Sequence, residues 1–390
     1  MSDITVIHTE HDGTPINTFR PENLNFTLRK GQDGPHDITY EISRSNTSTD
    51  MVGAYRTDFI LEVDSSAVPY VIMRGMHTSA PQITTDEERI QIAGKDWLHY
   101  LERRYWPFND SDPNFYRTGA GAVTDNNPPT GFSYYVDPLS PQDSMKIVTD
   151  LLDQILSLPN SMALTYTLPD IGHDIEFFSV DIFDSENILS KIQTLSQEDP
   201  GEFDFWVDSD KEFHVAAPYR YDIDVVGDNS LAVHTFDALT PSSGLFSINY
   251  ENIGPGCTRL YGSGANQSST LVATREYGPG STQFRLLEDH VSYTGVITRE
   301  RVQRLTRRDL LFRLNPIHNV SISVVPESIT NFWSVFHPGV AIWLIADLEA
   351  HTIDAAFEVV SIDGQSDTDG NMLATLNLNQ IYDPDVTIDD

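Results

Sequence analysis

The sequence predicts a mainly β protein with α/β insertions. Its apolar runs are short and rich in β-branched and aromatic residues, and Pro, Gly, Asn and Asp interrupt them at close intervals. Helical periodicity appears only in a few separate segments. With 390 residues, of which 39% are hydrophobic, the chain can fill more than one core. We therefore expect two β-rich blocks, residues 1–104 and 245–378, around an α/β middle.

The first block carries the alternation that is typical of a sheet with one dry face. Phe59, Leu61 and Val63 alternate with Asp58 and Glu62, and successive side chains of a strand point to opposite faces. The expected strands of this block are Ile4–His8, Leu24–Leu28, Ile38–Ile42, Thr57–Val63, Tyr70–His77 and Arg89–Ala93.

A short helix over Asp96–Arg104 follows these strands. Trp97, Leu98 and Leu101 share one helical face, and Asp96 is suited to the N-cap. We expect this face to pack on the first β block. From Tyr105 to Pro141 the composition changes to Asn, Asp, Pro, Gly and Tyr without periodicity, which predicts a long functional or linking loop.

The middle third predicts two helices and a hairpin. Apolar residues recur at helical spacing in Lys146–Leu156, which follows the acidic Asp143, and again in Ser185–Ser196. Beyond them, Phe203–Val207 and Glu212–Ala216 flank a polar turn, as in a β-hairpin.

The last third returns to strands, interrupted by one helix over Thr298–Leu314. We expect three domains, residues 1–140, 141–235 and 236–390. The strands expected in the last domain are Leu245–Tyr250, Leu271–Thr274, Val320–Val325, Val340–Ala346, Thr352–Ile362 and Met372–Leu378.

The charge of the chain is strongly negative. It has 24 basic and 58 acidic residues, a net charge of −34, and only five of the basic residues are lysines. Such a surface disfavours binding to phosphate backbones. It repels itself in dilute buffer and keeps its solubility in strong salt, where counterions screen it. The composition fits a halophilic setting, with an ordinary Asp-rich protein as the alternative.

The sequence lacks the residues that several classes of function require. Cys257 is the only cysteine, which leaves no disulfide, thiolate metal cluster or redox pair, and we expect it to be a small buried apolar residue. The segment Gly262–Gln267 begins like a dinucleotide-binding loop but lacks the third glycine. The longest apolar stretch, Val340–Ala346, is far too short for a membrane span, and we expect no membrane anchor.

Metal and catalytic motifs are equally weak, and we expect no cofactor, no metal and no enzyme activity. Asp363–Asn371 resembles a calcium loop but has Gln365 at the first ligand position, so a hairpin turn is the better interpretation. With so many carboxylates, no glycosidase pair can be argued from spacing. Two polar groups without a recognised metal spacing are interpreted as solvated: His8 with Glu10 and His11, and His173 with Asp174 and Glu176.

A segment after the first strands resembles a known family. Gly94-Lys95-Asp96-Trp97-Leu98, followed by Leu101 and Arg104, is similar to the Gly-(Arg/Lys)-Asp-(Trp/Leu)-Leu…Leu…Arg segment of hub and minor tail proteins of long-tailed phages. The order of elements is similar too. The family also continues with two helices, an aromatic hairpin like Phe203–Val215, a Pro-Gly-Val strand start like Pro338–Val340 and a final strand pair like Phe357–Ile362 with Met372–Leu378.

The resemblance implies a structural role at the tail tip, or baseplate, of a virion. It implies two tail-tube-like β-barrels joined by a small α/β domain, with three chains forming a ring of six barrels that joins a six-fold tube to a three-fold tip. The implied partners are further copies of the chain, the tail tube or distal tail protein, the tape-measure protein and a tip fibre or spike. DNA would pass through the acidic ring without specific binding. With the charge, this suggests the virus of a halophilic host.

The helix over Thr298–Leu314 is the one basic island, with six arginines between Arg299 and Arg313. We expect it to contact an acidic neighbour in the assembly, and the alternative is a solvated face that pairs with the chain's own acids. The candidate contact residues are Arg299, Arg304, Arg307 and Arg308.

Two other functions remain open from the sequence. A carbohydrate-binding adhesin would use the Tyr- and Asn-rich loop, because aromatic rings beside amides suit sugars. A secreted glycan hydrolase ranks last, since no acid pair stands out. The adhesin residues would be Tyr116, Asn126, Asn127, Tyr134 and Tyr135.

Overall fold

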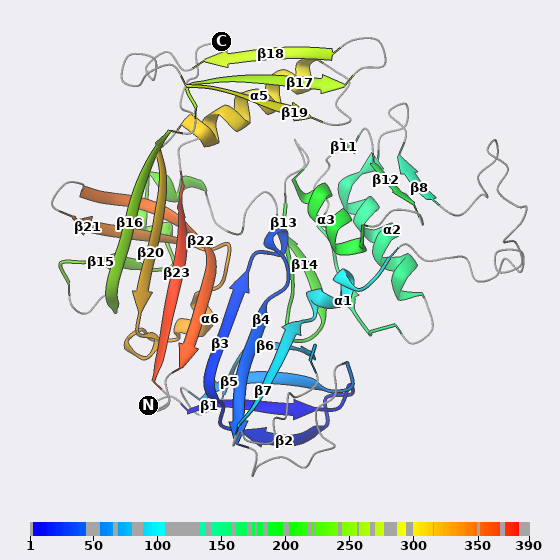
Figure 1. Ribbon diagram of the computed structural model, residues 1–390, viewed down its shortest axis with the longest axis vertical. Coiled ribbons are helices and arrows are strands. Elements are labelled where there is room, and N and C mark those ends of the chain that lie inside the picture. The colour runs from blue at the N-terminus through cyan, green and yellow to red at the C-terminus, as the bar shows by residue number, and fades with distance from the viewer. Residues whose placement is uncertain are drawn as a thin grey trace, which may run out of the picture.

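The protein is mainly β, and its strands and helices form four regions (Figure 1). The computed structural model describes residues 3–43, 55–64, 69–79, 89–105, 133–136, 142–157, 161–169, 174–175, 178–181, 186–197, 203–216, 220, 223–240, 244–255, 257–265, 270–276, 287–293, 299–314, 316–348, 352–366 and 371–381.

Seven strands form the region that we call the N-terminal strand group. They pair antiparallel in the order β3-β4-β7-β6-β5-β1-β2. Phe59, Leu61 and Val63 are buried, as their alternation predicts. The strands are β1 (Asp3–Thr9), β2 (Pro15–Phe19), β3 (Glu22–Arg29), β4 (Asp37–Ser43), β5 (Asp58–Asp64), β6 (Tyr70–His77) and β7 (Arg89–Asp96).

Six strands from the last third form the C-terminal strand group. The order β16-β20-β23-β22 is antiparallel, and β21 pairs with β22 and β15. The predicted hairpin between β22 and β23 is confirmed by the pairing of Ser366 with Met372. The strands are β15 (Thr235–Asp237), β16 (Leu245–Pro255), β20 (Pro316–Val324), β21 (Ala341–Asp347), β22 (Thr352–Ser366) and β23 (Met372–Gln380).

The two strand groups share one sheet, because β22 pairs antiparallel with β3. Gly364 lies opposite Phe26 at this seam, where a Cβ atom would come within 2.2 Å of the phenyl ring. Thr27 Oγ1 donates to Asp363 Oδ1 over 2.7 Å, between residues 336 positions apart. Lys30 Nζ lies 2.6 Å from Glu358 Oε1. The resemblance implies two barrels joined by an α/β domain, whereas the described strands join the groups directly and form no closed barrel.

One hydrophobic core runs through both strand groups. It contains Phe26 and Ile92 from the first group and Trp333 and Leu376 from the second, and the rings of Phe26 and Trp333 lie 5.5 Å apart. Between strands β20 and β21, α6 (Phe332–Val335) supplies two aromatic rings to this core. Short 3-10 helices occur at Gly31–Asp33, Ile223–Val226, Asn229–Leu231 and Pro326–Ser328.

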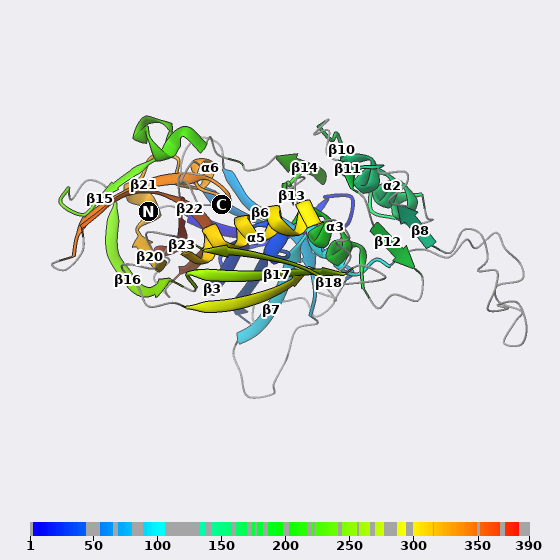
Figure 2. The same ribbon diagram turned by 90° about the horizontal axis from the view of Figure 1, so that it is seen from above.

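The middle of the chain forms a central module on the opposite side from the C-terminal strand group (Figures 1 and 2). The acidic Asp143 that precedes the predicted helix caps α2, since its Oδ1 accepts from the Met145 and Lys146 amides. The elements are α1 (Leu98–Glu102), α2 (Ser144–Leu156), α3 (Ile188–Ser196), β8 (Ser133–Val136), β9 (Gln142–Asp143), β10 (Thr165–Tyr166), β11 (Asp174–Ile175), β12 (Phe178–Asp181), β13 (Asp204–Val207) and β14 (Glu212–Ala216).

Two expectations for this module need correction. Trp97, Leu98 and Leu101 are buried, but they belong to the core of the central module and not to that of the first β block. The helix that they begin is also shorter than predicted. The segment Tyr105–Pro141 is not loop throughout, because β8 pairs antiparallel with β12. Residues 106–132 and 137–141 lie outside the described residues.

A small unit is inserted between β16 and β20. It consists of β17 (Arg259–Ala265), β18 (Thr270–Glu276), β19 (Glu288–Tyr293) and α5 (Arg299–Leu314). Its three strands form a separate sheet with β17 in the centre. Gly262 lies against α5, where a Cβ atom would meet Thr306 Oγ1 at 1.7 Å. The sequence predicts the helix but not this separate sheet, and the glycines of Gly262–Gln267 belong to a strand.

Two smaller expectations concern Cys257 and the membrane. Cys257 is fully buried beside Leu260 and Leu310, as predicted. Among the described residues, no helix combines the length and the apolar character that a membrane span requires.

Candidate functional site

The shared sheet ends at β16, which pairs with β20 on one side and with no other described strand. This strand has 11 residues, and a long strand at the end of a sheet offers backbone groups to a strand of another chain. The sequence predicts the strand but not its terminal position.

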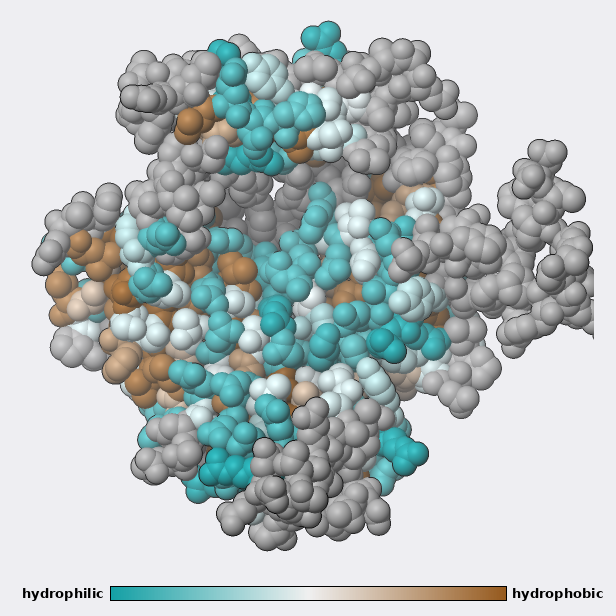
Figure 3. All heavy atoms as spheres, viewed as in Figure 1, coloured by the Kyte–Doolittle hydropathy of each residue, from teal (hydrophilic) through white to brown (hydrophobic). Residues whose placement is uncertain are grey.

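A β-bulge exposes an aromatic ring near the start of β16. Leu245 pairs with Val324 and Ser247 with Ser323, so that Phe246 is the extra residue. Phe246 is 69% exposed and Val325 is 36% exposed. Together with Met372 and Leu373 they line a cavity of about 720 Å³. Figure 3 shows apolar residues gathered on the side of the molecule that the C-terminal strand group forms. An exposed apolar surface of this kind is typical of a protein contact.

The other end of the sheet, β2, is built differently. It has five residues, begins with Pro15, and its register with β1 shifts between His8 and Thr9. Short strands, prolines and irregular register are the features that protect a sheet edge from unwanted pairing. The two ends of the sheet are therefore different surfaces.

Helix α5, which we call the arginine helix, turns its apolar face to its own sheet and its basic face outward. Val302, Thr306 and Leu310 are buried at helical spacing, whereas Arg299, Arg304 and Arg307 are exposed. At the end of the helix, Arg313 forms an ion pair with Asp289 of β19. The side chain of Arg308 lies outside the described side chains.

The arginine helix and Phe246 do not form one site. The inserted unit follows the end of β16, where Pro255 pairs with Pro316. Phe246 lies near the start of the same strand, nine residues away, and therefore about 30 Å along it. The predicted arginine contact and the exposed bulge are two separate candidate surfaces.

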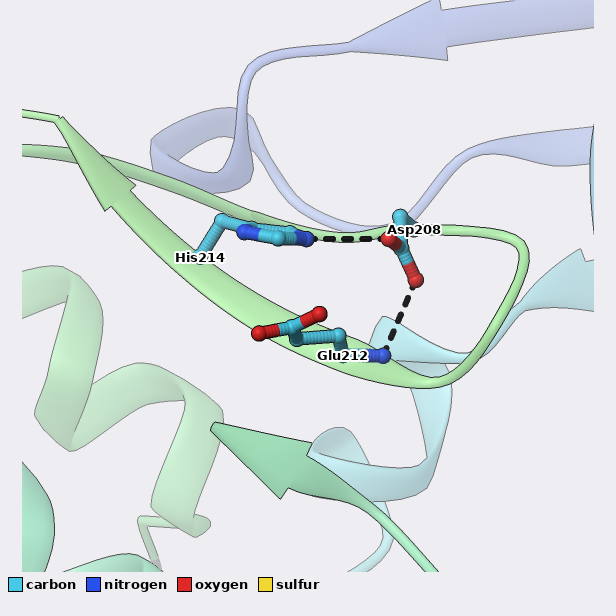
Figure 4. A group of neighbouring side chains, drawn as sticks. All are labelled: Asp208, Glu212 and His214. Atoms are coloured by element: carbon cyan, nitrogen blue, oxygen red, sulfur yellow. Dashed lines mark hydrogen bonds and ion pairs between the residues drawn. The ribbon is translucent and has the colours of Figure 1, made fainter. Parts of the chain in front are cut away.

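A carboxylate and histidine group lies at the β13–β14 turn (Figure 4). The candidate ligand atoms of Asp208, Glu212 and His214 lie within 4.8 Å of one another. However, Asp208 Oδ1 accepts from the Asp210 and Glu212 amides at 2.8 and 2.9 Å, and Oδ2 lies 2.9 Å from His214 Nε2. Burial alone would raise the pKa of Asp208, but hydrogen bonds from His214 and the two amides lower it. The group thus fixes the turn of the hairpin.

The metal groups weighed from the sequence are not brought together in the described residues. The interpretation of His8 as solvated is wrong, because His8 is buried and its Nε2 lies 2.6 Å from the Tyr40 hydroxyl. His11 Nδ1 instead lies 3.1 Å from Asp58 Oδ1. Of the second group, His173 and Glu176 lie outside the described residues.

Comparisons with known proteins identify the class of fold. No protein-family model matches the sequence, and no curated protein sequence matches it. A tail protein from Neisseria meningitidis MC58 has a similar structure, with a TM-score of 0.64, 12% identity and 98% of both chains covered.

Two prophage proteins share the fold as well. The 43 kDa tail protein of prophage MuSo2 from Shewanella oneidensis has a TM-score of 0.62 and 10% identity, over 97% of this chain and 98% of that one. Prophage tail protein gp18 from Listeria monocytogenes EGD-e has a TM-score of 0.52 and 11% identity, over 97% and 95%. The chain therefore has the fold of phage tail proteins, as the resemblance in its sequence implies.

Proposed function

We propose that the chain is a structural, non-enzymatic subunit of a virion tail tip, and that three copies form the hub ring. The observation that carries this proposal is a sheet with two unlike ends, one blunted at β2 and one extended and apolar at β16. The shared fold with tail proteins supports the same role.

Unlike ends favour a ring over a two-fold dimer. When one surface binds a different surface of the next copy, the contact is head-to-tail, and it closes into a ring if the rotation permits. In this proposal β16 of one copy contacts a surface of the next copy other than its β2 edge, whose features oppose strand pairing. Each strand group then acts as one tube-like barrel unit. The proposed domains are residues 1–140, 141–235 and 236–390, of which the first supplies α1 and β8 to the central module.

The proposed partners of the ring follow from its place between the tail tube and the tip of the tail. The ring would contact the tail tube or distal tail protein above, enclose the end of the tape-measure protein, and hold a tip fibre or spike below. A net charge of −34 suits a pore through which DNA passes without binding. The same charge suits a virus of a halophilic host.

The β16 contact can be tested by charging the exposed bulge. Phe246→Lys with Ser247→Lys places two cations on an edge, which opposes strand pairing. Light scattering should show a trimer for the wild type and a monomer for the double variant, with the same circular dichroism spectrum. Leu239→Lys is the matched control, since Leu239 is 76% exposed but lies outside β16. A double variant that remains trimeric would contradict the β16 contact. A wild type that is monomeric within tails would contradict the ring itself.

The arginine helix is tested separately. Reversing Arg304, Arg307 and Arg308 to Glu should block incorporation into tails while the isolated chain stays folded, because an acidic neighbour would then be repelled. Normal incorporation of the triple variant would show that this helix makes no charged assembly contact.

A further inference from the structure

A second cavity, of about 550 Å³, lies where the N-terminal strand group meets α1 and the β13–β14 turn. This volume is within the range of small-molecule sites. Aromatic rings and charged groups share its walls, which include Tyr55, Asp58, Trp97, Tyr100, Arg103 and Lys211. None of these residues belongs to β16 or to the arginine helix, so the cavity is independent of the assembly surfaces.

Lys211 stands apart from the other lysines of the chain. Lys30, Lys95, Lys146 and Lys191 each form an ion pair with a carboxylate. Lys211 has no such pair among the described residues, and its ammonium lies 4.4 Å from the centre of the Trp97 ring. Within the part of the chain that the structure describes, its ammonium donates to one acceptor, the His11 carbonyl at 3.4 Å. In a chain with 58 acidic residues, an unpaired lysine beside a cavity is unexpected.

A second cation lies at the same cavity. The guanidinium of Arg103 is 5.8 Å from the centre of the Tyr55 ring, and Arg103 also has no carboxylate partner among the described residues. Arginine and lysine together favour a carboxylate or a similar anion. The described residues thus place two cations at the cavity without a carboxylate at ion-pair distance, although the charge of Lys211 opposes the rise that burial causes in the pKa of Asp58.

Polar groups on other walls complete the chemistry. Asp58 is 4% exposed and accepts from the exposed His11 at 3.1 Å, so one buried carboxylate lies at the cavity. The indole Nε1 of Trp97 is buried without an acceptor among the described residues. Buried polar groups normally have partners. An anionic ligand that also carries hydroxyl groups would suit this combination.

Backbone strain is concentrated at the same place. The described chain has four non-glycine residues with positive φ, and two of them, Tyr55 at 61° and Lys211 at 65°, line this cavity. Such conformations cost free energy in residues with a Cβ. At Lys211 the β13–β14 turn holds this conformation, since the Lys211 amide donates to the Asp208 carbonyl.

From this geometry we infer that the cavity binds a carboxylated sugar unit. Its carboxylate lies between Lys211 and Arg103, the apolar face of its ring lies against the aromatic walls, and its hydroxyl groups donate to Asp58. The site therefore recognises an acidic glycan chain, and this role is separate from assembly.

Calorimetry with trigalacturonate tests the inference, at an ionic strength of about 0.15 M that screens the long-range repulsion from the net charge of −34. The wild type should bind it at least tenfold more tightly than the neutral galactotriose. Lys211→Asn should weaken binding at least tenfold, because asparagine tolerates the left-handed conformation but lacks the charge. Lys146→Asn is the matched control and should bind like the wild type, since Lys146 pairs with Asp150 on exposed helix α2.

Three results would overturn the inference: equal affinity for the neutral sugar, unchanged affinity of Lys211→Asn, or a preference for tri-aspartate over trigalacturonate. A thermal melt of Lys211→Asn close to that of the wild type shows that lost binding is not lost folding. The double lysine variant of Phe246 and Ser247 should retain full affinity, which separates this site from the proposed ring contact.

Discussion

The two strand groups belong to one sheet and share one core, yet they end in opposite ways. The N-terminal group ends in a five-residue strand that starts with proline. The C-terminal group ends in an 11-residue strand with a bulge and an exposed phenyl ring. The β2 edge is poorly suited to pairing with another strand, whereas the β16 edge, which pairs with no further described strand, has backbone groups that can pair. A continuous sheet in which only one edge strand can pair with another chain is suited to joining copies of the chain in one direction.

The groups differ in their interiors as well. The N-terminal group buries a polar network, in which the Tyr40 hydroxyl lies 2.6 Å from His8 Nε2 and 2.9 Å from His77 Nε2. Thr57 Oγ1 lies 2.9 Å from His77 Nδ1. In contrast, the buried side chains of the C-terminal group that belong to the shared core are apolar. The first group should therefore respond to acid more strongly than the second.

The largest expected effect concerns the helix that connects the N-terminal group to the central module. Trp97 is 4% exposed, and Trp97→Ala should lower the free energy of unfolding by about 3 to 5 kcal/mol, because the central core loses a large ring. Urea denaturation measures this loss. Trp343→Ala, in the C-terminal group, should cost less because Trp343 is only partly buried. Equal losses at the two positions would contradict this packing.

Acid should destabilise the N-terminal group over a defined pH range. Burial, before any other cause, lowers the pKa of His8 to about 3 and that of His77 to about 4. Unfolded histidines take up protons near their ordinary pKa of 6.5. The unfolded state therefore becomes more stable relative to the folded state as the pH falls from about 6.5 to 4. We expect a loss of about 2 kcal/mol per histidine at pH 5.

Three other titrations must be separated from this one. Burial raises the pKa of Asp96, in the same strand group, to about 8, so its contribution to stability increases as the pH falls below 8 and opposes the histidine effect. Carboxylates with a lowered pKa, such as Asp208, lose their contribution only as the pH falls through that lowered value. The net charge of −34 also becomes smaller toward the isoelectric point, which reduces self-repulsion. Urea denaturation at pH 7 and pH 5 in molar KCl removes most of the charge effect. His77→Gln should flatten the pH dependence, and an unchanged slope would assign it to other groups.

The seam between the two groups is the next place to perturb. Gly364→Ala puts a methyl group within 2.2 Å of the buried Phe26 ring and should cost about 2 kcal/mol. Gly227→Ala is the matched control, because its Cβ would meet nothing closer than 3.8 Å. If both substitutions have the same small effect on the denaturation midpoint, the seam is not tightly packed.

Local patterns predict much of this fold. The alternation of Phe59, Leu61 and Val63 predicts a buried strand face, and Asp143 predicts the start of α2, because each signal lies within a few residues. The strands β2, β17 and β19 were not predicted, since their runs are short, polar or rich in glycine. Their pairing, and not their composition, makes them strands.

Long-range pairing explains the features that the sequence could not indicate. The contact of Phe26 with Gly364 joins residues from opposite ends of the chain. The cavity likewise depends on the contact of the Trp97 ring with Lys211, which lies beyond helices α2 and α3 in the sequence. The bulge at Phe246 is visible only once Val324 and Ser323 have been paired with β16. Candidate sites built from such contacts need the three-dimensional structure.

The smallest expected effect is that of salt on the whole chain. Like charges repel across a surface with 58 acidic and 24 basic residues, and molar KCl shortens the screening length to about 3 Å. The melting temperature should therefore rise by several degrees between dilute buffer and molar KCl. Trimer formation would also raise it, since association stabilises the folded state. The double lysine variant of Phe246 and Ser247 separates the two causes: screening predicts the same rise in this monomer, and a rise confined to the wild type would assign the effect to the β16 contact. A melting temperature that does not change in either protein would contradict a halophilic setting.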